Sequence, residues 1–382
     1  MLLKLSTFIS SLLLVLPIFS TAKVVFKRSI SQAAREHLGR VIGGSDASQG
    51  EFPFAAFLIV DEGDQTAFCG GTIIDKQWIL TAGHCVVDAS SGGNSLNVSI
   101  PLIAGTKGSH NATIVRNHLW PNRRSLQGRK YNAVSAKNIV VGVGNVYNAD
   151  SSPYKVSKVH VHPDLNLDYF DNDIALLKLK TKLKFSDTVQ PIRIDTGSIS
   201  DGMTVTGIGW GMTSLHHHVT ADVLQAVNLQ IGNQALCHRI RPTFDSNDGN
   251  YICVTTPDGR DTCSGDSGGP LLRRCSSNLA SSGTTGEGPW LQLGITSYGD
   301  NSELSDDTVC AATNGAGFYT HVATYLDYIA KTTGIKREDL AASCSGNQIA
   351  YNARSNAAVS AAQMSYLSTI SVLLAAMSLL AK

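Results

Sequence analysis

Three short stretches of the chain carry a histidine, an aspartate and a serine in surroundings that suit nucleophilic catalysis. His84 lies in Leu-Thr-Ala-Gly-His-Cys, Asp173 in Asp-Asn-Asp-Ile-Ala-Leu, and Ser267 in Ser-Gly-Asp-Ser-Gly-Gly-Pro. A serine hydroxyl is a poor nucleophile at neutral pH, so it needs a base within hydrogen-bond reach. A histidine can take its proton and later return it to a leaving amine, while a carboxylate fixes the imidazole tautomer and stabilises the imidazolium. These residue types predict Ser267 as nucleophile, His84 as base and Asp173 as its partner.

The order His, Asp, Ser and the residues around each of them resemble the chymotrypsin/trypsin family of serine endopeptidases, over about residues 41–333. The resemblance implies an all-β fold of two antiparallel six-stranded β-barrels with a C-terminal helix. It implies a secreted endopeptidase that hydrolyses peptide bonds through an acyl-enzyme and needs no cofactor. It also implies that the backbone N–H groups of Gly265 and Ser267 form the oxyanion hole, which contributes a few kcal/mol to transition-state stabilisation.

The expected specificity pocket follows from the same resemblance. Asp261 lies six residues before Ser267, where the family has the floor of its primary pocket. An acid there attracts Arg or Lys side chains, which implies cleavage after these residues. The other expected pocket residues are Thr262, Ser297, Tyr298, Gly299 and Gly317. In the family the segment matching 297–299 pairs with the substrate backbone; Tyr298 stands where Trp is usual, and Ala316 where Pro is common.

The segment Arg40-Val41-Ile42-Gly43-Gly44 resembles the family's activation junction, with the usual Ile-Val order swapped. Cleavage after Arg40 would free the ammonium of Val41. In the family this charge inserts beside the acid that precedes the nucleophile, here Asp266, and such a buried ion pair can act as a two-state switch. The resemblance therefore implies a zymogen whose propeptide is residues 23–40.

The chain has eight cysteines, an even number that suits disulfide bonding in an oxidising compartment. Spacing alone does not give the connectivity. The family resemblance implies three bridges, Cys69–Cys85, Cys237–Cys253 and Cys263–Cys310. By elimination, Cys275 and Cys344 are expected to pair and to tie the end of the last helix to the body.

The elements that must position these residues are mostly strands. Charged residues make up only 16% of the chain and there are 35 glycines, which favours a loop-rich β protein over a helical bundle. Alternating apolar positions, typical of half-buried strands, recur at 159–161, 203–205, 227–231 and 291–295. Only residues 322–332 are predicted to be helical.

Residues 88–135 differ from the rest of the chain. They are rich in Ser, Gly and Asn, and carry six bases against one acid. Both N-glycosylation sequons of the chain, at Asn97 and Asn111, lie here, so this segment is predicted to be a glycosylated surface insertion.

Two other functions compete with proteolysis. One is a cell-surface adhesion protein that uses the basic segment 88–135. The other is a catalytically inactive homologue serving as a binding or inhibitor module. Such homologues typically lose a triad residue, whereas this chain has all three.

The two ends have compositions of their own. Residues 1–22 have a lysine, an apolar run and small residues at the end, as in a secretory signal peptide. The catalytic domain is assigned to 41–343 and a tail to 344–382. In the tail, the small residues 355–358, an eight-residue spacer and the apolar run 367–381 have the layout of a GPI-attachment signal; a marginal membrane anchor and a loose tail are the alternatives.

The charge distribution restricts the classes of binding partner that we expect for this chain. Residues 41–353 hold 23 bases and 29 acids, and this acidic balance argues against nucleic-acid binding. The expected partners are protein or peptide substrates and protein protease inhibitors, with the chain itself a monomer. No metal site is expected: the histidines 216–218 fall in a loop that varies in the family, and the segment 142–154, which matches its calcium loop, holds only Asp150.

Overall fold

The computed structural model describes residues 43–61, 66–88, 130–213, 220–256, 259–275, 288–301, 310–311 and 315–344. Several predicted features lie outside these residues: Arg40, Val41, Asn97, Asn111, the histidines 216–218, the signal and propeptide segments, and the tail from residue 345 on. Within the described part of the chain, no helix is both long enough and apolar enough to span a bilayer.

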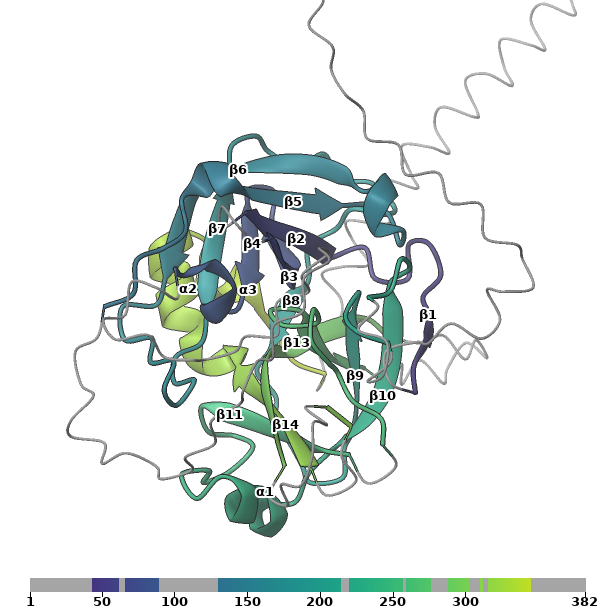
Figure 1. The fold of residues 1–382 in the computed structure, drawn as a ribbon, viewed down its shortest axis with the longest axis vertical. Coiled ribbons are helices and arrows are strands. Elements are labelled where there is room, and N and C mark those ends of the chain that lie inside the picture. Colours follow the sequence, from purple (N-terminus) through teal and green to yellow (C-terminus); the bar gives the residue numbers. More distant parts are fainter. Residues whose placement is uncertain are drawn as a thin grey trace, which may run out of the picture. The chain divides into compact units, whose positions relative to one another are not determined.

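Six antiparallel strands close into a first barrel in the order β2-β3-β4-β7-β6-β5 (Figure 1). Their bounds are β2 Ala55–Asp61, β3 Thr66–Asp75, β4 Trp78–Thr81, β5 Ile139–Val143, β6 Ser152–Val161 and β7 Ala175–Leu179. In β5 the residues Ile139, Val141 and Val143 are buried while those between them are partly exposed. This period of two points one row of side chains into the barrel.

A second barrel is formed by β9 Thr204–Gly209, β10 Gln225–Ile231, β11 Tyr251–Thr255, β12 Pro270–Arg274, β13 Trp290–Asn301 and β14 Gly315–His321. The strands follow the order β12-β9-β10-β11-β14-β13, and the pairing of β12 with β13 closes the ring. The apolar alternation predicted at 227–231 is confirmed, because Val227, Leu229 and Ile231 are buried. The two six-stranded antiparallel barrels confirm the predicted fold class.

Three further strands extend the second barrel. The strand β8 (Arg193–Asp195) runs parallel to β13, β15 (Ala341–Ala342) runs parallel to β8, and β1 (Ser45–Asp46) pairs antiparallel with β10. The prediction was of antiparallel strands alone, so the two parallel pairings are an addition that the sequence pattern did not show.

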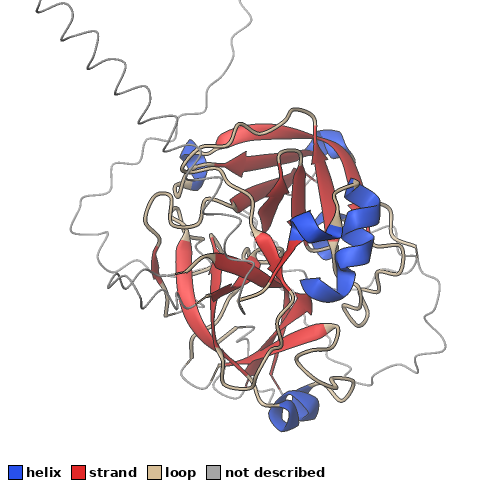
Figure 2. Cartoon of the chain, turned by 180° about the vertical axis from the view of Figure 1, so that it is seen from behind, coloured by secondary structure: helices blue, strands red, loops and turns tan. Residues whose placement is uncertain are grey.

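The helices lie outside the barrels (Figure 2). The helix predicted at 322–332 is present as η7 (Val322–Tyr325) followed by α2 (Leu326–Thr333), which ends at Gly334 in the left-handed conformation. The prediction that no other segment is helical was wrong. The further helices are α1 Gln234–Ile240, α3 Arg337–Leu340, η2 His84–Val86, η5 Ala136–Asn138 and η6 Asn148–Asp150. They are too short to show a clear helical periodicity, and α1 depends on the Asn233 side chain, which caps the N–H of Leu236.

Four disulfides link the cysteines, and the pairs are Cys69–Cys85, Cys237–Cys253, Cys263–Cys310 and Cys275–Cys344. These are the expected pairs. The last bridge joins the end of β12 to the residues that follow β15, so it holds the C-terminal end of the described chain against the second barrel.

Candidate active site

The pairing of β4 with β7 brings His84 and Asp173 together. Thr81 at the end of β4 lies opposite Ala175 at the start of β7, so the residues just beyond these two strand ends meet. His84 Nδ1 lies 2.7 Å from Asp173 Oδ2, and the backbone N–H of His84 donates to Asp173 Oδ1 at 2.8 Å. These two contacts fix the imidazole against the carboxylate, with Nδ1 facing the acid.

Asp173 is completely buried, and the second barrel supplies two more of its contacts. The hydroxyl of Ser297, on β13, donates to Asp173 Oδ2, and the hydroxyl of Thr320, on β14, donates to the Asp173 carbonyl. Burial by itself would raise the pKa of this carboxyl, but the charge of His84 and the hydrogen bonds from His84 and Ser297 outweigh it and hold the pKa below its usual value. Asp173 is therefore ionised at neutral pH. The sequence placed Ser297 only in the pocket wall and missed this contact.

Ser267 lies in a tight turn that leads into β12 and contacts the first barrel. The N–H of Gly70, on β3, donates to the Ser267 carbonyl at 2.7 Å. Gly265 and Gly268 have φ angles of 97° and 80°, which L residues adopt only with strain. A Cβ on Gly268 would also lie only 2.2 Å from Thr81 Oγ1. The glycines around Ser267 are therefore required for this turn and for its close approach to the first barrel.

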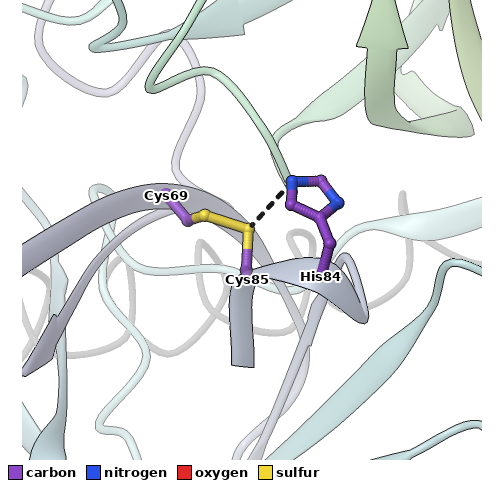
Figure 3. Close-up of side chains that lie close together, drawn as sticks. All are labelled: Cys69, His84 and Cys85. Carbon is purple, nitrogen blue, oxygen red and sulfur yellow. Dashed lines mark hydrogen bonds between the residues drawn. A yellow bond between two sulfur atoms is a disulfide. The ribbon is translucent and has the colours of Figure 1, made fainter. Parts of the chain in front are cut away.

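His84 and Ser267 flank the same disulfide. Cys85 Sγ lies 3.8 Å from His84 Nε2, the nitrogen that faces away from Asp173 (Figure 3). The same sulfur lies 3.6 Å from the Ser267 carbonyl oxygen. Among the described residues no hydrogen bond joins His84 Nε2 to Ser267 Oγ. In substrate-free enzymes this contact is often long and shortens when substrate binds.

Cys69, His84 and Cys85 have their ligand atoms close enough together to hold a metal ion. Both sulfurs belong to the Cys69–Cys85 disulfide, which is drawn in Figure 3. Only thiolates are good metal ligands, so the bridge removes two of the three candidate ligands. We therefore interpret this cluster as the structural support of His84.

The two N–H groups predicted to bind the oxyanion lie on either side of a buried acid. Neither the Gly265 nor the Ser267 backbone N–H has a backbone acceptor within the described residues. Asp266, between them, is completely buried, and its two carboxylate oxygens accept the N–H groups of Gly211 and Cys263 at 2.7 and 2.8 Å. Asp266 thereby anchors the turn from inside.

Asp261 has one occupied oxygen and one open oxygen. Oδ2 accepts the N–H of Ala311 at 3.2 Å, whereas Oδ1 is buried and has no hydrogen-bond partner among the described residues. Burial raises the pKa of this carboxyl to about 7, although the N–H groups of Ala311 and Thr262 act against the shift. A buried acceptor without a partner costs free energy unless a ligand supplies a donor.

Two glycines face each other across β13 and β14 beside Asp261. Gly299 and Gly317 are paired in register, and a Cβ on Gly317 would lie 3.3 Å from Asp261 Oδ1. The wall next to them is held by a 2.8 Å hydrogen bond between the hydroxyls of Thr262 and Tyr319. The structure therefore brings Asp261, Thr262, Gly299 and Gly317 together, and their role in binding a substrate side chain stays a prediction.

One charged cluster beside the site was not predicted from the sequence. Arg241, Asp171 and Tyr251 lie next to Tyr298, and Arg241 bonds to both Asp171 and the Tyr298 hydroxyl. Of the three, only Asp171 lies in a motif considered above, as the first residue of the segment around Asp173, and no role was predicted for it. A lone arginine after a short helix has no periodicity or spacing that distinguishes it from a surface residue.

A sequence model of the family described as Trypsin matches residues 41–128 and 126–329 of this chain. Together the two matches span well over half of the chain, and the two-barrel fold agrees with them. The chain belongs to the trypsin family of serine proteases.

Individual relatives include both trypsins and chymotrypsins. Trypsin-1 of Astacus astacus is 31% identical over 300 residues, which cover 76% of this chain and 98% of the relative. Chymotrypsin of Phaedon cochleariae is 26% identical over 312 residues, or 81% of this chain and 87% of the relative. Ovochymase of Halocynthia roretzi is 29% identical over 305 residues, which are 77% of this chain but only 16% of that protein. Because the relatives carry different names, the comparisons do not decide which substrate this chain prefers. That preference must be argued from the residues around Asp261.

Proposed function

We propose that this trypsin-family protease cleaves peptide bonds after Arg or Lys and that His84, Asp173 and Ser267 are its catalytic residues. In this mechanism Ser267 Oγ attacks the carbonyl carbon while His84 Nε2 takes the hydroxyl proton. The C–N bond then breaks, and the leaving amine takes that proton from His84. Water, activated by the same imidazole, hydrolyses the acyl-enzyme and regenerates Ser267. The N–H groups of Gly265 and Ser267 bind the oxyanion in both steps.

The open oxygen of Asp261 is the observation that carries the specificity. A carboxyl buried beside Gly317, with one oxygen bonded and the other without a partner among the described residues, fits the donors of a guanidinium or ammonium group. A cation in the pocket would favour the ionised form and would offset the burial that raises the pKa of Asp261 to about 7. An apolar substrate side chain would leave this buried acid unsatisfied.

We further infer that the enzyme is made as a zymogen and activated by cleavage after Arg40. Burial raises the pKa of Asp266 to about 6, and the partners that support its charge are backbone N–H groups. A cation that reached Asp266 would stabilise the ionised carboxylate. The Val41 ammonium freed by cleavage is such a cation, and its arrival would order the Ser267 turn through Asp266.

We also infer export, because the signal-like residues 1–22 and the four disulfides both fit an oxidising compartment. The tail has the composition of a GPI-attachment signal, and we propose that it is exchanged for a lipid anchor near residues 355–358. Phosphatidylinositol-specific phospholipase C should then release the enzyme from cells. Recovery of cell-bound protein that still ends at Lys382 would contradict the lipid anchor.

The catalytic assignment is tested with an arginine ester and a serine-directed phosphonate. Wild-type enzyme should show a burst of acyl-enzyme and should be labelled, whereas Ser267→Ala should lose labelling and fall in kcat by several orders of magnitude. His84→Ala should show a similar loss of kcat. Near-normal turnover in Ser267→Ala would exclude the mechanism, and an unreactive wild type would favour the inactive homologue.

Asp261→Ser tests the pocket separately from the catalytic residues. This variant should lose Arg-ester cleavage by a factor equivalent to a few kcal/mol of transition-state binding, because the substrate cation has lost its partner. It should still react with a small phosphonate that carries no basic group. Unchanged kcat/KM toward the arginine ester would show that Asp261 is not the specificity residue.

A further inference from the structure

Arg241, the residue that follows α1, is the largest side chain that the described fold buries completely, with 1% of its surface exposed. It lies beside an apolar cluster that includes Phe244 and Phe318. A buried guanidinium is costly unless its charge and its N–H groups are all satisfied. The groups that contact Arg241 therefore indicate its structural role.

The Arg241 guanidinium contacts three polar groups and lies closest to the ring of Tyr251. Nη2 lies 3.0 Å from Asp171 Oδ1, Nε donates to Thr243 Oγ1 at 3.0 Å, and Nη1 donates to the Tyr298 hydroxyl. The guanidinium carbon lies 3.9 Å from the ring centre of Tyr251, whose hydroxyl donates to the same Asp171 oxygen. Burial raises the pKa of both tyrosines well above their usual values, so their hydroxyls are neutral at working pH.

The cluster connects the two barrels at the catalytic aspartate. Asp171 lies two residues before Asp173, in the segment between β6 and β7 of the first barrel, whereas Arg241 comes from the second barrel. On either side of Asp171, Phe170 and Asn172 have φ angles of 53° and 55°, in the left-handed region. Such a backbone persists only when surrounding contacts hold it. The Arg241–Asp171 pair is one of those contacts.

The same cluster holds the Phe170 and Tyr298 rings beside His84, where they form one wall of the proposed substrate cleft. The Phe170 ring lies edge-on to the His84 imidazole with ring centres 5.8 Å apart, and it stacks on Tyr298 at 4.8 Å. Both Phe170 and Tyr298 are only partly buried. On β13, Tyr298 is next to Gly299, which pairs with Gly317 beside Asp261. A substrate whose basic side chain binds Asp261, as proposed above, would place its preceding residues against the Phe170–Tyr298 wall.

We propose that Arg241 is a positioning residue that holds Asp171 and Tyr298 together and thereby fixes the Phe170–Tyr298 wall. The position of this wall then determines how much the substrate residues before the cleaved bond contribute to kcat/KM. Arg241 is buried away from the substrate and acts only through these two partners. The proposal rests on the proposed function, because it concerns the same cleft. It predicts an effect that depends on substrate length, which a general loss of stability would not produce.

The test compares two substrates with the same 4-nitroanilide leaving group, acetyl-arginine and a peptide with three further residues before the arginine. Activated enzyme is normalised by phosphonate titration of Ser267, so that only folded, reactive molecules count. In Arg241→Met, kcat/KM for the long substrate should fall about tenfold further than for the short one, since a loosened wall misplaces the added residues.

The matched control is Arg273→Met. Arg273 forms another buried pair in the second barrel, with its Nε 2.6 Å from Asp195 Oδ2, but it contacts neither Asp171 nor Tyr298. This variant should also be destabilised, because it leaves the fully buried Asp195 carboxylate without its ion pair. Its ratio of long-substrate to short-substrate kcat/KM should remain that of the wild type.

A second variant removes the problem of an unpaired charge. Arg241→Met combined with Asp171→Asn buries no lone ion, so it should regain stability, yet its length ratio should stay low because Tyr298 has lost its anchor. A wild-type ratio in either Arg241 variant, or an equal fall for both substrates, would overturn the inference and leave the proposed function intact. Failure of the phosphonate to label wild-type enzyme would instead contradict the proposed function, and this inference would fail with it.

Discussion

At the scale of single residues, two buried carboxyl groups near Ser267 differ in how many of their oxygens accept hydrogen bonds. Asp266 has both oxygens bonded to backbone N–H groups, whereas Asp261 leaves Oδ1 without a partner among the described residues. A site that is open toward a ligand must be incomplete before the ligand arrives, and this incompleteness lowers the stability of the free protein. We therefore expect Asp261 to lower the stability of the free protein while it makes the protease specific for basic side chains.

Asp261→Asn should stabilise the fold at pH 8 by up to a few kcal/mol and should have a much smaller effect at pH 4. The fold raises the pKa of Asp261 from 3.8 to about 7, so the unfolded chain releases its proton first as the pH rises. Stability from this group is therefore lost between about pH 4 and about pH 7. Asparagine stays neutral throughout, and its amide oxygen can still accept the N–H of Ala311.

The measurement is denaturant unfolding at both pH values, with Ser267→Ala as the background to prevent self-digestion. Exposed Asp187→Asn is the control and should show no such difference. If Asp261→Asn gave the same change in the free energy of unfolding at pH 4 and pH 8, the raised pKa of Asp261 would be refuted.

At the scale of elements, strand register places one half of the site and a glycine turn places the other. The β4–β7 pairing sets His84 opposite Asp173, and Gly268 lets the Ser267 turn reach β3 and β4. Register determines positions all along a strand, so the first half is supported by many hydrogen bonds. The turn depends on a few positions, and we expect it to be the more sensitive half.

Gly268→Ala should abolish most activity and destabilise the protein, whereas Gly202→Ala should be mild. Both glycines have positive φ angles, 80° and 72°. An added Cβ at Gly268 would lie 2.2 Å from Thr81 Oγ1 and 2.5 Å from the Gly70 carbonyl oxygen, while at Gly202 it would meet nothing within 4 Å. Backbone strain alone should cost Gly202→Ala about 1–2 kcal/mol.

Phosphonate labelling and thermal unfolding measure the two effects. Equal losses in Gly268→Ala and Gly202→Ala would mean that backbone conformation, and not the close approach of the two barrels, explains the glycine at 268.

At the scale of the whole molecule, the proposed active site exists only because two barrels are packed together. His84 and Asp173 come from the first barrel, and Ser267, Ser297 and the Asp261 pocket come from the second. The proposed activation also involves distant parts of the molecule, because the ammonium freed by a cut after Arg40 would reach Asp266, next to the nucleophile. The proposed specificity also matches the activation junction. If Asp261 makes the enzyme prefer Arg, the enzyme can cleave its own precursor after Arg40.

We therefore expect the zymogen to activate itself in trans. N-terminal sequencing after incubation of purified precursor should find Val41 in the wild type and an unprocessed start in Ser267→Ala and Asp261→Ser. The first variant lacks the nucleophile, and the second lacks the partner for Arg40. Appearance of Val41 at the wild-type rate in Ser267→Ala, without added protease, would show that activation is external.

Much of this protein could be predicted from local residue patterns. The segments around His84, Asp173 and Ser267 identified the family, because each is a short run whose residue types the chemistry and the turn require. Strand alternation at 227–231 and the helix at 322–332 were predictable for a similar reason, since both periodicities are properties of adjacent residues.

Only the tertiary structure decided which distant residues support the site. The bond from Ser297 to Asp173 spans 124 residues of sequence, and the bond from Arg241 to Asp171 spans 70. The open oxygen of Asp261 depends likewise on where β13, β14 and Ala311 come to lie. Such contacts form when the two barrels close and pack, and their energy depends on burial, which no short stretch of sequence contains.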